Sequence, residues 1–444
     1  MTLRLFIAIL LASLGTVRAG DLDPPGTVIE TFKDLSLLDT RIPIDATDTP
    51  GDDDAVFIIN RPGRYKLVGN LTGEAGKVGI RVEPAPEDLG SVDIDVGGFT
   101  MSGVPGSLDA IRINEAIGFG SVAVSNGTIT GWGEDGIDSL TGAFLEDLTV
   151  TGCAGRGIAC TDTGRVTNVR VNDNGTFGIA FDGRNVRFTN VSASGNGATG
   201  IKVGNRSVCT GCTATSNGPI GIEVGSLSQV IDCTATGHPS TNIKAADNCK
   251  VLRCTTADTQ FGQGVSTGES CTIEACTADD CSFGIVCGAA SECVDCTTRR
   301  CDAGIQGFSS FTCRGCTVTD TNFEAIIASD GCHIEDCNVI GTMNSEGIVV
   351  SGRDVVVRGN RVEGCFRGIA SYGGLTDGSV IIDNQCDHCL MEGFWLFASG
   401  ATLVRNRACG NNGGGAQYSI AAGNKAGAIT SDPTTAGPWD NFEF

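Results

Sequence analysis

Acidic, arginine and tryptophan side chains recur at matching places near the C-terminal end of the chain. Glu324, Glu346, Arg367 and Glu392 each stand directly before a Gly or Ala that opens a short apolar segment, and Trp395 follows soon after. Carboxylates stacked on one another perturb each other's protonation or recruit a cation, and an adjacent arginine and an exposed indole suit a sugar acid. We predict catalytic roles for the four charged residues and substrate binding for Trp395. The alternative is a structural or calcium-binding role.

Two further sets of charged residues belong to the same Gly-Ile segments, where the residue before the Gly and the residue after the Ile both face outward. Asp135 and Asp138 form a smaller acidic pair, which predicts a metal site with Ca²⁺ as the candidate cofactor. Lys202, Glu223 and Lys244 alternate in sign at equivalent places, and we interpret them as ion pairs across neighbouring strands on a solvated face.

The elements that position these residues follow a repeat. From position 136 a Gly followed by a β-branched residue returns regularly, and eleven steps separate Ile137 from Ile369, which is 21.1 residues per step. Further apolar residues fall about 8, 11 and 13 positions after each leading Ile, among Gly, Asn, Asp and Ser. Each repeat therefore reads as three short strands with period-2 alternation.

Three short strands in 21 residues cannot enclose a core of their own, but they can form one coil that stacks on the next. The predicted fold is all-β, a single-stranded parallel β-helix of about sixteen coils. Weaker coils are expected at Ile80 and Ile111, and looser ones at Phe394 and Ile420.

The cysteines follow the same lattice. Seven successive coils carry Cys eleven positions after the leading Ile, which predicts an internal ladder of stacked cysteines. One interpretation is that Cys acts as a small buried hydrophobe, and the other is that disulfides form within coils. The candidates for pairing are Cys209, Cys212, Cys249, Cys254, Cys271, Cys276, Cys293, Cys296, Cys313, Cys316, Cys332 and Cys337.

Four C-x-x-C strings suggest zinc or redox chemistry. Those that begin at Cys209, Cys293 and Cys313 fall on the repeat lattice, which favours a packing role. The fourth, Cys386-Asp387-His388-Cys389, contains the ligand types of a zinc site, with Cys365 or Cys409 one coil away.

The two ends of the chain differ from the repeats. Residues 1–19 read as a signal peptide, with Arg4 before the apolar run from Leu5 to Leu14. We expect a lead-in and cap over 20–60 with a helix at 27–38, a β-helix over 61–423, and a C-terminal tail or cap over 424–444. An exported protein is therefore predicted, located in the periplasm, at the cell surface or outside the cell.

Composition restricts the partners. The chain has 444 residues and a formal net charge of −22, which argues against nucleic acid because such binding depends on Lys and Arg clusters. No later apolar run is long enough to span a membrane. Cations and neutral polymers are the expected partners.

The Gly-Ile coils resemble the exported bacterial right-handed parallel β-helix repeat proteins, which share their fold with pectate lyases. A second likeness lies in an N-terminal block that includes Arg41-Ile42-Pro43-Ile44 and Pro62-Gly63-Arg64-Tyr65. The resemblance implies a right-handed coil and a polysaccharide partner. It also implies, for an enzyme, a lyase, a hydrolase or an epimerase that acts on polysaccharide along a groove.

Two functions from different classes follow. The first is a protein that binds or processes extracellular polysaccharide along an outer groove near Glu324, Glu346, Arg367, Glu392 and Trp395. The alternative is a non-enzymatic structural or adhesive protein of the cell surface or matrix, formed by the regular coils.

Overall fold

The structure, a computed structural model, describes residues 39–83, 90–114, 121–342, 344–372, 376–411 and 416–444. The chain divides into two compact units, residues 1–41 and Ile42–Phe444. The described residues contain strands and turns and no helix. The helix expected at 27–38 lies outside the described residues.

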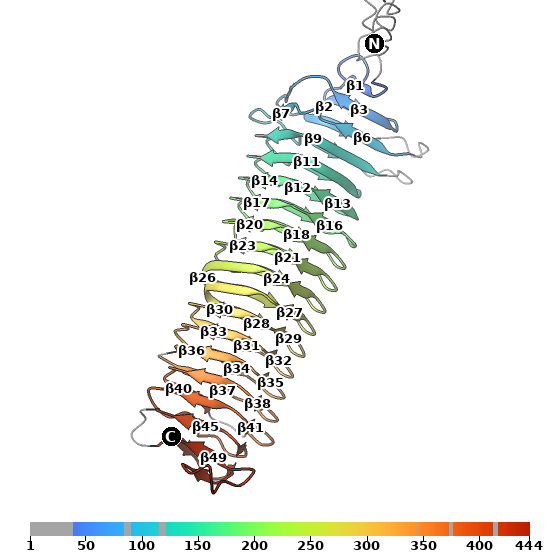
Figure 1. Cartoon of the computed structure of the whole chain (residues 1–444). Helices are drawn as coiled ribbons and strands as arrows, with labels where there is room; N and C mark the ends of the chain where they lie inside the picture. Colours follow the sequence, from blue (N-terminus) through green and yellow to red (C-terminus); the bar gives the residue numbers. More distant parts are fainter. Residues whose placement is uncertain (1–38, 84–89, 115–120, 343, 373–375, 412–415) are drawn as a thin grey trace, which may run out of the picture. The chain divides into compact units, whose positions relative to one another are not determined.

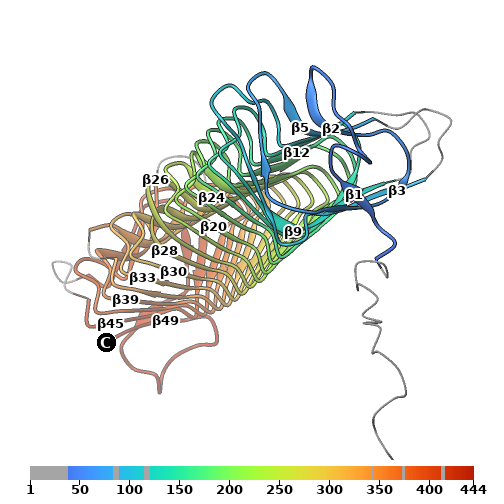
Figure 2. The same cartoon turned by 90° about the horizontal axis from the view of Figure 1, so that it is seen from above.

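Three parallel sheets run the length of the second unit, and each coil contributes one strand to each sheet (Figures 1 and 2). The first sheet holds the Gly-Ile strands, with each strand paired to its counterpart in the next coil. Its strands are β2 (Ala55–Ile59), β5 (Val78–Val82), β8 (Ile111–Ile113), β10 (Ile137–Ser139), β12 (Ile158–Cys160), β15 (Ile179–Phe181), β18 (Ile201–Val203), β21 (Ile220–Val224), β24 (Thr241–Ala245), the end of β26 (Thr255–Thr267), the end of β28 (Thr277–Cys287), β31 (Ala303–Gly307), β34 (Ile326–Ala328), β37 (Glu346–Val350), β40 (Arg367–Ser371), β43 (Phe394–Leu396) and β46 (Tyr418–Ile420).

The second sheet holds the strand that follows in each coil. Its strands are β1 (Ile42–Ile44), β3 (Gly63–Leu67), β6 (Val92–Asp95), the start of β9 (Val122–Thr130), the start of β11 (Ala143–Thr151), β13 (Gly164–Thr167), β16 (Arg187–Thr189), β19 (Val208–Thr210), β22 (Gln229–Ile231), β25 (Lys250–Leu252), β27 (Thr272–Glu274), β29 (Glu292–Val294), β32 (Thr312–Arg314), β35 (His333–Glu335), β38 (Val356–Arg358), β41 (Val380–Ile382), β44 (Thr402–Val404) and β47 (Lys425–Ala426).

The third sheet closes each coil. It consists of β4 (Leu71–Thr72), β7 (Thr100–Ser102), the ends of β9 and β11, β14 (Arg170–Asn172), β17 (Ser192–Ser194), β20 (Thr213–Thr215), β23 (Thr234–Thr236), the starts of β26 and β28, β30 (Thr297–Arg299), β33 (Thr317–Thr319), β36 (Asn338–Ile340), β39 (Arg361–Glu363), β42 (Gln385–Asp387), β45 (Arg407–Cys409), β49 (Asn441–Glu443) and, paired to β49, β48 (Ile429–Thr430).

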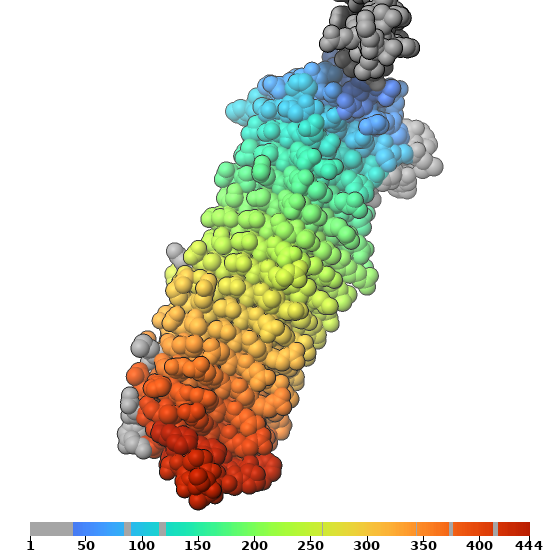
Figure 3. Space-filling model, in the orientation of Figure 1, coloured from blue at the N-terminus to red at the C-terminus, as the bar shows by residue number. Residues whose placement is uncertain are grey.

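The expected parallel β-helix is confirmed, and it has about 17 turns. The additional coil is the one that contains β2, where Phe57 pairs in register with Ile80. Strand pairing also continues past residue 423, because β49 pairs with β45 in the last coil. In the space-filling view the colours change in successive bands, as expected when each coil contacts only its neighbours (Figure 3).

The Gly in each Gly-Ile pair lies where a side chain has no room. A Cβ atom on Gly368 would lie 2.3 Å from the carbonyl oxygen of Gly393 in the next coil and 2.7 Å from the Sγ of Cys386 inside the coil. The leading Ile then points into the core, and Ile348 and Ile369 stack in register and are fully buried. Close approach of neighbouring coils therefore explains the repeat.

The corners between strands explain the small polar residues. A residue in the left-handed region turns the chain at each bend, such as Gly211 and Asp232, and the residue after it points inward. The inward side chain accepts a hydrogen bond from the backbone amide of the equivalent residue one coil earlier. Cys212 N donates to Cys233 Sγ at 3.4 Å, and Asn360 N donates to Asn384 Oδ1 at 3.0 Å. Ser, Cys and Asn therefore satisfy corner amides that the strand ladder does not reach.

This geometry confirms the buried cysteine ladder and corrects the expectation of disulfides. All 22 cysteines lie in the described residues and all are free. Thiols stacked at strand spacing point in parallel, and two Sγ pairs at 3.7 Å are far beyond the S–S bond of about 2.05 Å. The residues concerned are Cys209, Cys212, Cys249, Cys254, Cys271, Cys276, Cys293, Cys296, Cys313, Cys316, Cys332 and Cys337.

No helix in the described part of the chain is long and apolar enough to cross a membrane.

Candidate functional site

The site is built on the outer face of the first sheet, where strands β37, β40 and β43 stack. Glu346 pairs in register with Arg367, and Ala370 pairs with Trp395. Glu392 lies two residues before Phe394, as Arg367 lies two residues before Ile369, so these side chains follow one column across three coils. Parallel pairing without a register shift therefore brings together residues that are 21 and 25 positions apart.

Arg367 lies between two carboxylates. Its Nη1 is 3.1 Å from Glu346 Oε1, and its Nε is 3.1 Å from Glu392 Oε2. Ser345 Oγ donates to Glu346 Oε2 at 3.0 Å, and the hydroxyl of Tyr372 donates to Glu346 Oε1. The Glu346 side chain is 6 % exposed and that of Arg367 is 18 % exposed, so this is a largely buried polar network.

Aromatic rings surround the arginine. The guanidinium carbon of Arg367 lies 4.4 Å from the centre of the Trp395 ring and 4.9 Å from that of Phe366. Tyr372 packs on Trp395 at 5.0 Å, and Phe397 stacks on it at 5.6 Å with an interplanar angle of 12°. Phe397 is 66 % exposed and Tyr372 is 37 % exposed, so part of this aromatic platform faces solvent.

The network shifts two ionisation equilibria. Burial and the hydrogen bond to Glu346 raise the pKa of Tyr372 to about 12. Burial lowers the pKa of Arg367, but the hydrogen bonds to Glu392 and Glu346 outweigh it and raise that pKa overall. Tyr372 is therefore a neutral hydrogen-bond donor and Arg367 is a fixed cation at any physiological pH.

This arrangement suits binding better than acid–base chemistry. Glu346 already accepts hydrogen bonds from Ser345, Arg367 and Tyr372, and Glu392 is held by the same arginine. Glu324 is half-buried before β34 and is not one of the two carboxylates that Arg367 pairs with. The Arg367 guanidinium lies between Glu346 and Glu392, where a bound calcium ion was the alternative expected from the sequence. The catalytic roles of Glu324, Glu346, Arg367 and Glu392 stay a prediction.

Asp135 and Asp138 belong to a second charged cluster on the same sheet. They line a hollow of about 370 Å³ together with Asp109, Arg112, Glu134 and Arg156. Asp135 Oδ2 lies 2.7 Å from Arg156 Nη2, which is also 3.4 Å from Asp138 Oδ1. Here too an arginine lies between the two carboxylates, so it competes with the predicted Ca²⁺, which stays a prediction.

Sequence reasoning missed four members of this cluster: Asp109, Arg112, Glu134 and Arg156. Asp109 is 2 % exposed, burial raises its pKa, and its Oδ2 accepts from Arg112 Nε at 2.6 Å. The signal was present, because Asp109 and Arg156 stand two residues before the leading Ile, as Glu346 and Arg367 do. Following that one column along every coil would have added Asp109 and Arg156, whereas Arg112 and Glu134 stand outside it.

The remaining predicted groups have structural positions. Lys244 Nζ lies 3.1 Å from Glu223 Oε1, which confirms one cross-strand ion pair, whereas Lys202 Nζ pairs with Asp182 at 2.8 Å. The zinc set at Cys386, His388 and Cys389 is not assembled. Cys386 and Cys389 point into the core, while His388 is exposed at a corner with a φ of 53°, and Cys365 and Cys409 complete no set with it.

The chain belongs to the right-handed β-helix family. The family model described as right handed beta helix region matches residues 114–229, 182–310 and 304–432. Among curated proteins there is no match.

Three solved structures are distantly similar. ORF18 of Geobacillus virus E2 is 14 % identical over 58 % of this chain, with a TM-score of 0.26, and the match spans half of that protein. The A-module of the Azotobacter vinelandii mannuronan C-5 epimerase AlgE4 is 15 % identical, with 73 % of this chain and 86 % of the module covered and a TM-score of 0.26. PfbA, a surface adhesin of Streptococcus pneumoniae, is 12 % identical, with 80 % and 82 % covered and a TM-score of 0.25. Scores this low support no argument about activity.

Proposed function

We propose that this protein binds a neutral saccharide polymer on the outer face of the first sheet, at the platform formed by Tyr372, Trp395 and Phe397. The observation that carries the proposal is the exposed ring of Phe397, stacked at 12° on a tryptophan that the Arg367 network holds in place. An exposed aromatic ring that is held in place packs against the apolar face of a pyranose ring and loses little freedom on binding.

Charge favours a neutral ligand over a polyanion. Glu346, Arg367 and Glu392 together carry a net charge of −1, and the whole chain carries −22. An acidic polymer would meet repulsion from the chain and would find the Arg367 guanidinium already paired. The hydroxyl groups of a neutral sugar can bond to the solvent-facing edges of the network without displacing an ion pair.

Affinity electrophoresis tests the proposal, with the full chain run through gels that contain soluble neutral or acidic polysaccharides. We expect retardation by at least one neutral polymer and a loss of affinity of about fivefold in Phe397→Ala, because one exposed stacking contact is worth about 1 kcal/mol. Phe261→Ala is the matched control, since Phe261 is 86 % exposed and lies in β26, several coils away from the aromatic platform. No retardation by any neutral polymer, or an equal effect of both variants, would sink the proposal.

The same samples separate binding from processing. Because both carboxylates are held by Arg367, we expect no new reducing or unsaturated ends after long incubation with a retained polymer. Release of such ends, abolished by Glu346→Gln, would instead establish the catalytic roles predicted from the sequence.

A non-enzymatic surface or matrix protein is the second candidate. The observation that favours it is the regular register, in which 17 coils pair strand by strand in the first sheet. Such a protein would not need the aromatic platform, so Phe397→Ala and Trp395→Ala would leave its adhesion unchanged.

A further inference from the structure

Two C-x-x-C strings stack on consecutive coils in the middle of the β-helix. Cys293 in β29 pairs in register with Cys313 in β32. Three residues later in each string, Cys296 and Cys316 follow corner residues in the left-handed region and also point inward. All four of these cysteines are at most 1 % exposed, so their thiols are closed off from solvent.

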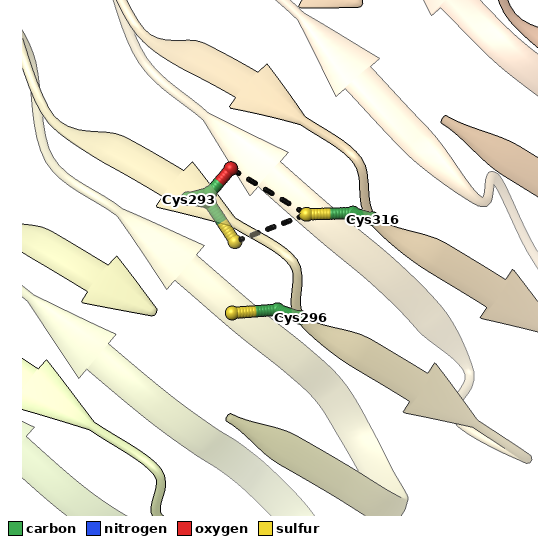
Figure 4. Close-up of side chains that lie close together, drawn as sticks. All are labelled: Cys293, Cys296 and Cys316. Atoms are coloured by element: carbon green, nitrogen blue, oxygen red, sulfur yellow. Dashed lines mark hydrogen bonds between the residues drawn. The ribbon is translucent and has the colours of Figure 1, made fainter. Parts of the chain in front are cut away.

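The sulfur atoms of Cys293, Cys296 and Cys316 converge (Figure 4). The Sγ atoms of Cys293, Cys296 and Cys316 all lie within 4.8 Å of one another. Cys293 Sγ and Cys316 Sγ are 3.7 Å apart, whereas the sulfur of Cys313 lies 3.7 Å from that of Cys337 in the following coil. The converging set therefore takes both cysteines of the first string and the second cysteine of the next string.

The separation fits a metal better than a covalent bond. A disulfide requires about 2.05 Å between sulfurs. Thiolates that occupy corners of a tetrahedron at the usual Zn–S distance of about 2.3 Å are about 3.8 Å apart, which matches the 3.7 Å between Cys293 and Cys316. The sulfur of Cys296 lies within 4.8 Å of both.

We propose that Cys293, Cys296 and Cys316 form a buried site for a thiophilic metal ion, with Zn²⁺ as the probe and Cu⁺ as the other ion of the same chemistry. The spacing C-x₂-C-x₁₆-C-x₂-C lies within the range that is typical of zinc-binding chains. The ion binds as thiolates form, and their protons pass to solvent while the coils assemble. This proposal does not depend on saccharide binding.

Elsewhere in the cysteine ladder, no two C-x-x-C strings stand on consecutive coils. The string at Cys209 and Cys212 is followed one coil later by Val230 and Cys233, so one coil supplies a single sulfur there. Among the described residues, the set at Cys293, Cys296 and Cys316 is the cysteine group close enough to hold one ion. The pair Cys209 and Cys212 therefore provides an internal control.

The test measures the metal content of the full chain, produced in zinc-supplemented and in copper-supplemented cultures and purified without chelator. Because the site is closed, the ion must be present during folding. Cys293→Val is the test variant and Cys209→Val the matched control, since Val230 and Val251 occupy the same place in neighbouring coils and show that the lattice accepts valine. Circular dichroism confirms that each variant is folded.

We expect about one ion per chain in the wild-type protein and in Cys209→Val, and a loss of about tenfold or more in Cys293→Val. Copper at the same ratio, with the same dependence on Cys293, would support the site and identify the ion. Fewer than about one ion per ten folded chains in both cultures would overturn the proposal. So would an equal loss in both variants, or a disulfide that leaves 20 of the 22 thiols titratable after unfolding.

Discussion

Replacing Arg367 by methionine would remove the cation that holds two buried carboxylates. The variant keeps much of the packing on Trp395 but leaves Glu346 and Glu392 without their shared partner, with side chains only 6 % and 15 % exposed. Removing one member of a fully buried ion pair costs about 3–5 kcal/mol. Since the Arg367 side chain is 18 % exposed, solvent screening reduces the expected loss to about 2–3 kcal/mol.

The assay is urea unfolding followed by far-ultraviolet circular dichroism and tryptophan fluorescence. A double-mutant cycle with Glu346→Gln isolates the pair, and we expect a coupling free energy of about 1–2 kcal/mol. The control is Arg405→Met, because Arg405 and Asp383 form a similar ion pair between coils whose side chains are 41 % and 40 % exposed. Its effect should be clearly smaller.

A loss of stability below about 0.5 kcal/mol in Arg367→Met would refute this reasoning. Equal losses for Arg367→Met and Arg405→Met would do the same. Either result would mean that burial does not strengthen the ion pairs of Arg367.

Three further predictions concern the core and the aromatic platform. Asn384→Ala should lower the free energy of unfolding in urea by about 3 kcal/mol, because it leaves the backbone and side-chain amides of Asn360 without their acceptor. Asn384→Cys should cost less, since a cysteine sulfur accepts the equivalent backbone amide in other coils. Equal losses in the two variants would contradict this prediction. Gly368→Ala should cost about 2–3 kcal/mol, because the new Cβ would lie 2.3 Å from the Gly393 oxygen, and a neutral substitution would show that the coils can separate. The pKa of Tyr372 is raised to about 12, so its contribution to stability should be complete below pH 10 and lost as the pH rises from 10 to about 12. The measurement is an absorbance titration of tyrosine ionisation in the wild type and in Tyr372→Phe. A difference between their absorbance near pH 10 would contradict the prediction.

Much of the candidate site could be predicted from column positions in the repeat. Glu346, Arg367 and Glu392 were found because each stands before the Gly of a coil, and Trp395 because it lies one residue after Phe394. Tyr372 and Phe397 were missed, because they lie just after their strands, where the lattice does not fix the direction of a side chain. Their contact with Trp395 follows from how the chain leaves β40 and β43.

The cysteines show the limit of the sequence most clearly. Position and spacing predicted a buried ladder, which the structure confirms at Cys212, Cys233 and Cys254. They left open whether the thiols pair with each other, because that depends on how far apart the sulfurs lie. Stacking at strand spacing decides against bonds in the described structure and places the sulfurs of Cys293, Cys296 and Cys316 within 4.8 Å of one another.

By itself the sequence determined the architecture, because a period of 21 residues with a Gly-Ile pair is set by local strand length and by the close contact of neighbouring coils at that Gly. It also determined which residues share a column. Only the tertiary structure decided what each column does. Arg367 forms ion pairs with both of its neighbours in the column, Glu346 and Glu392, and Arg156 lies between Asp135 and Asp138, which the sequence presented as an acidic pair. The physical reason is that the partner of a long side chain depends on its conformation and its burial, and strand register alone does not specify either.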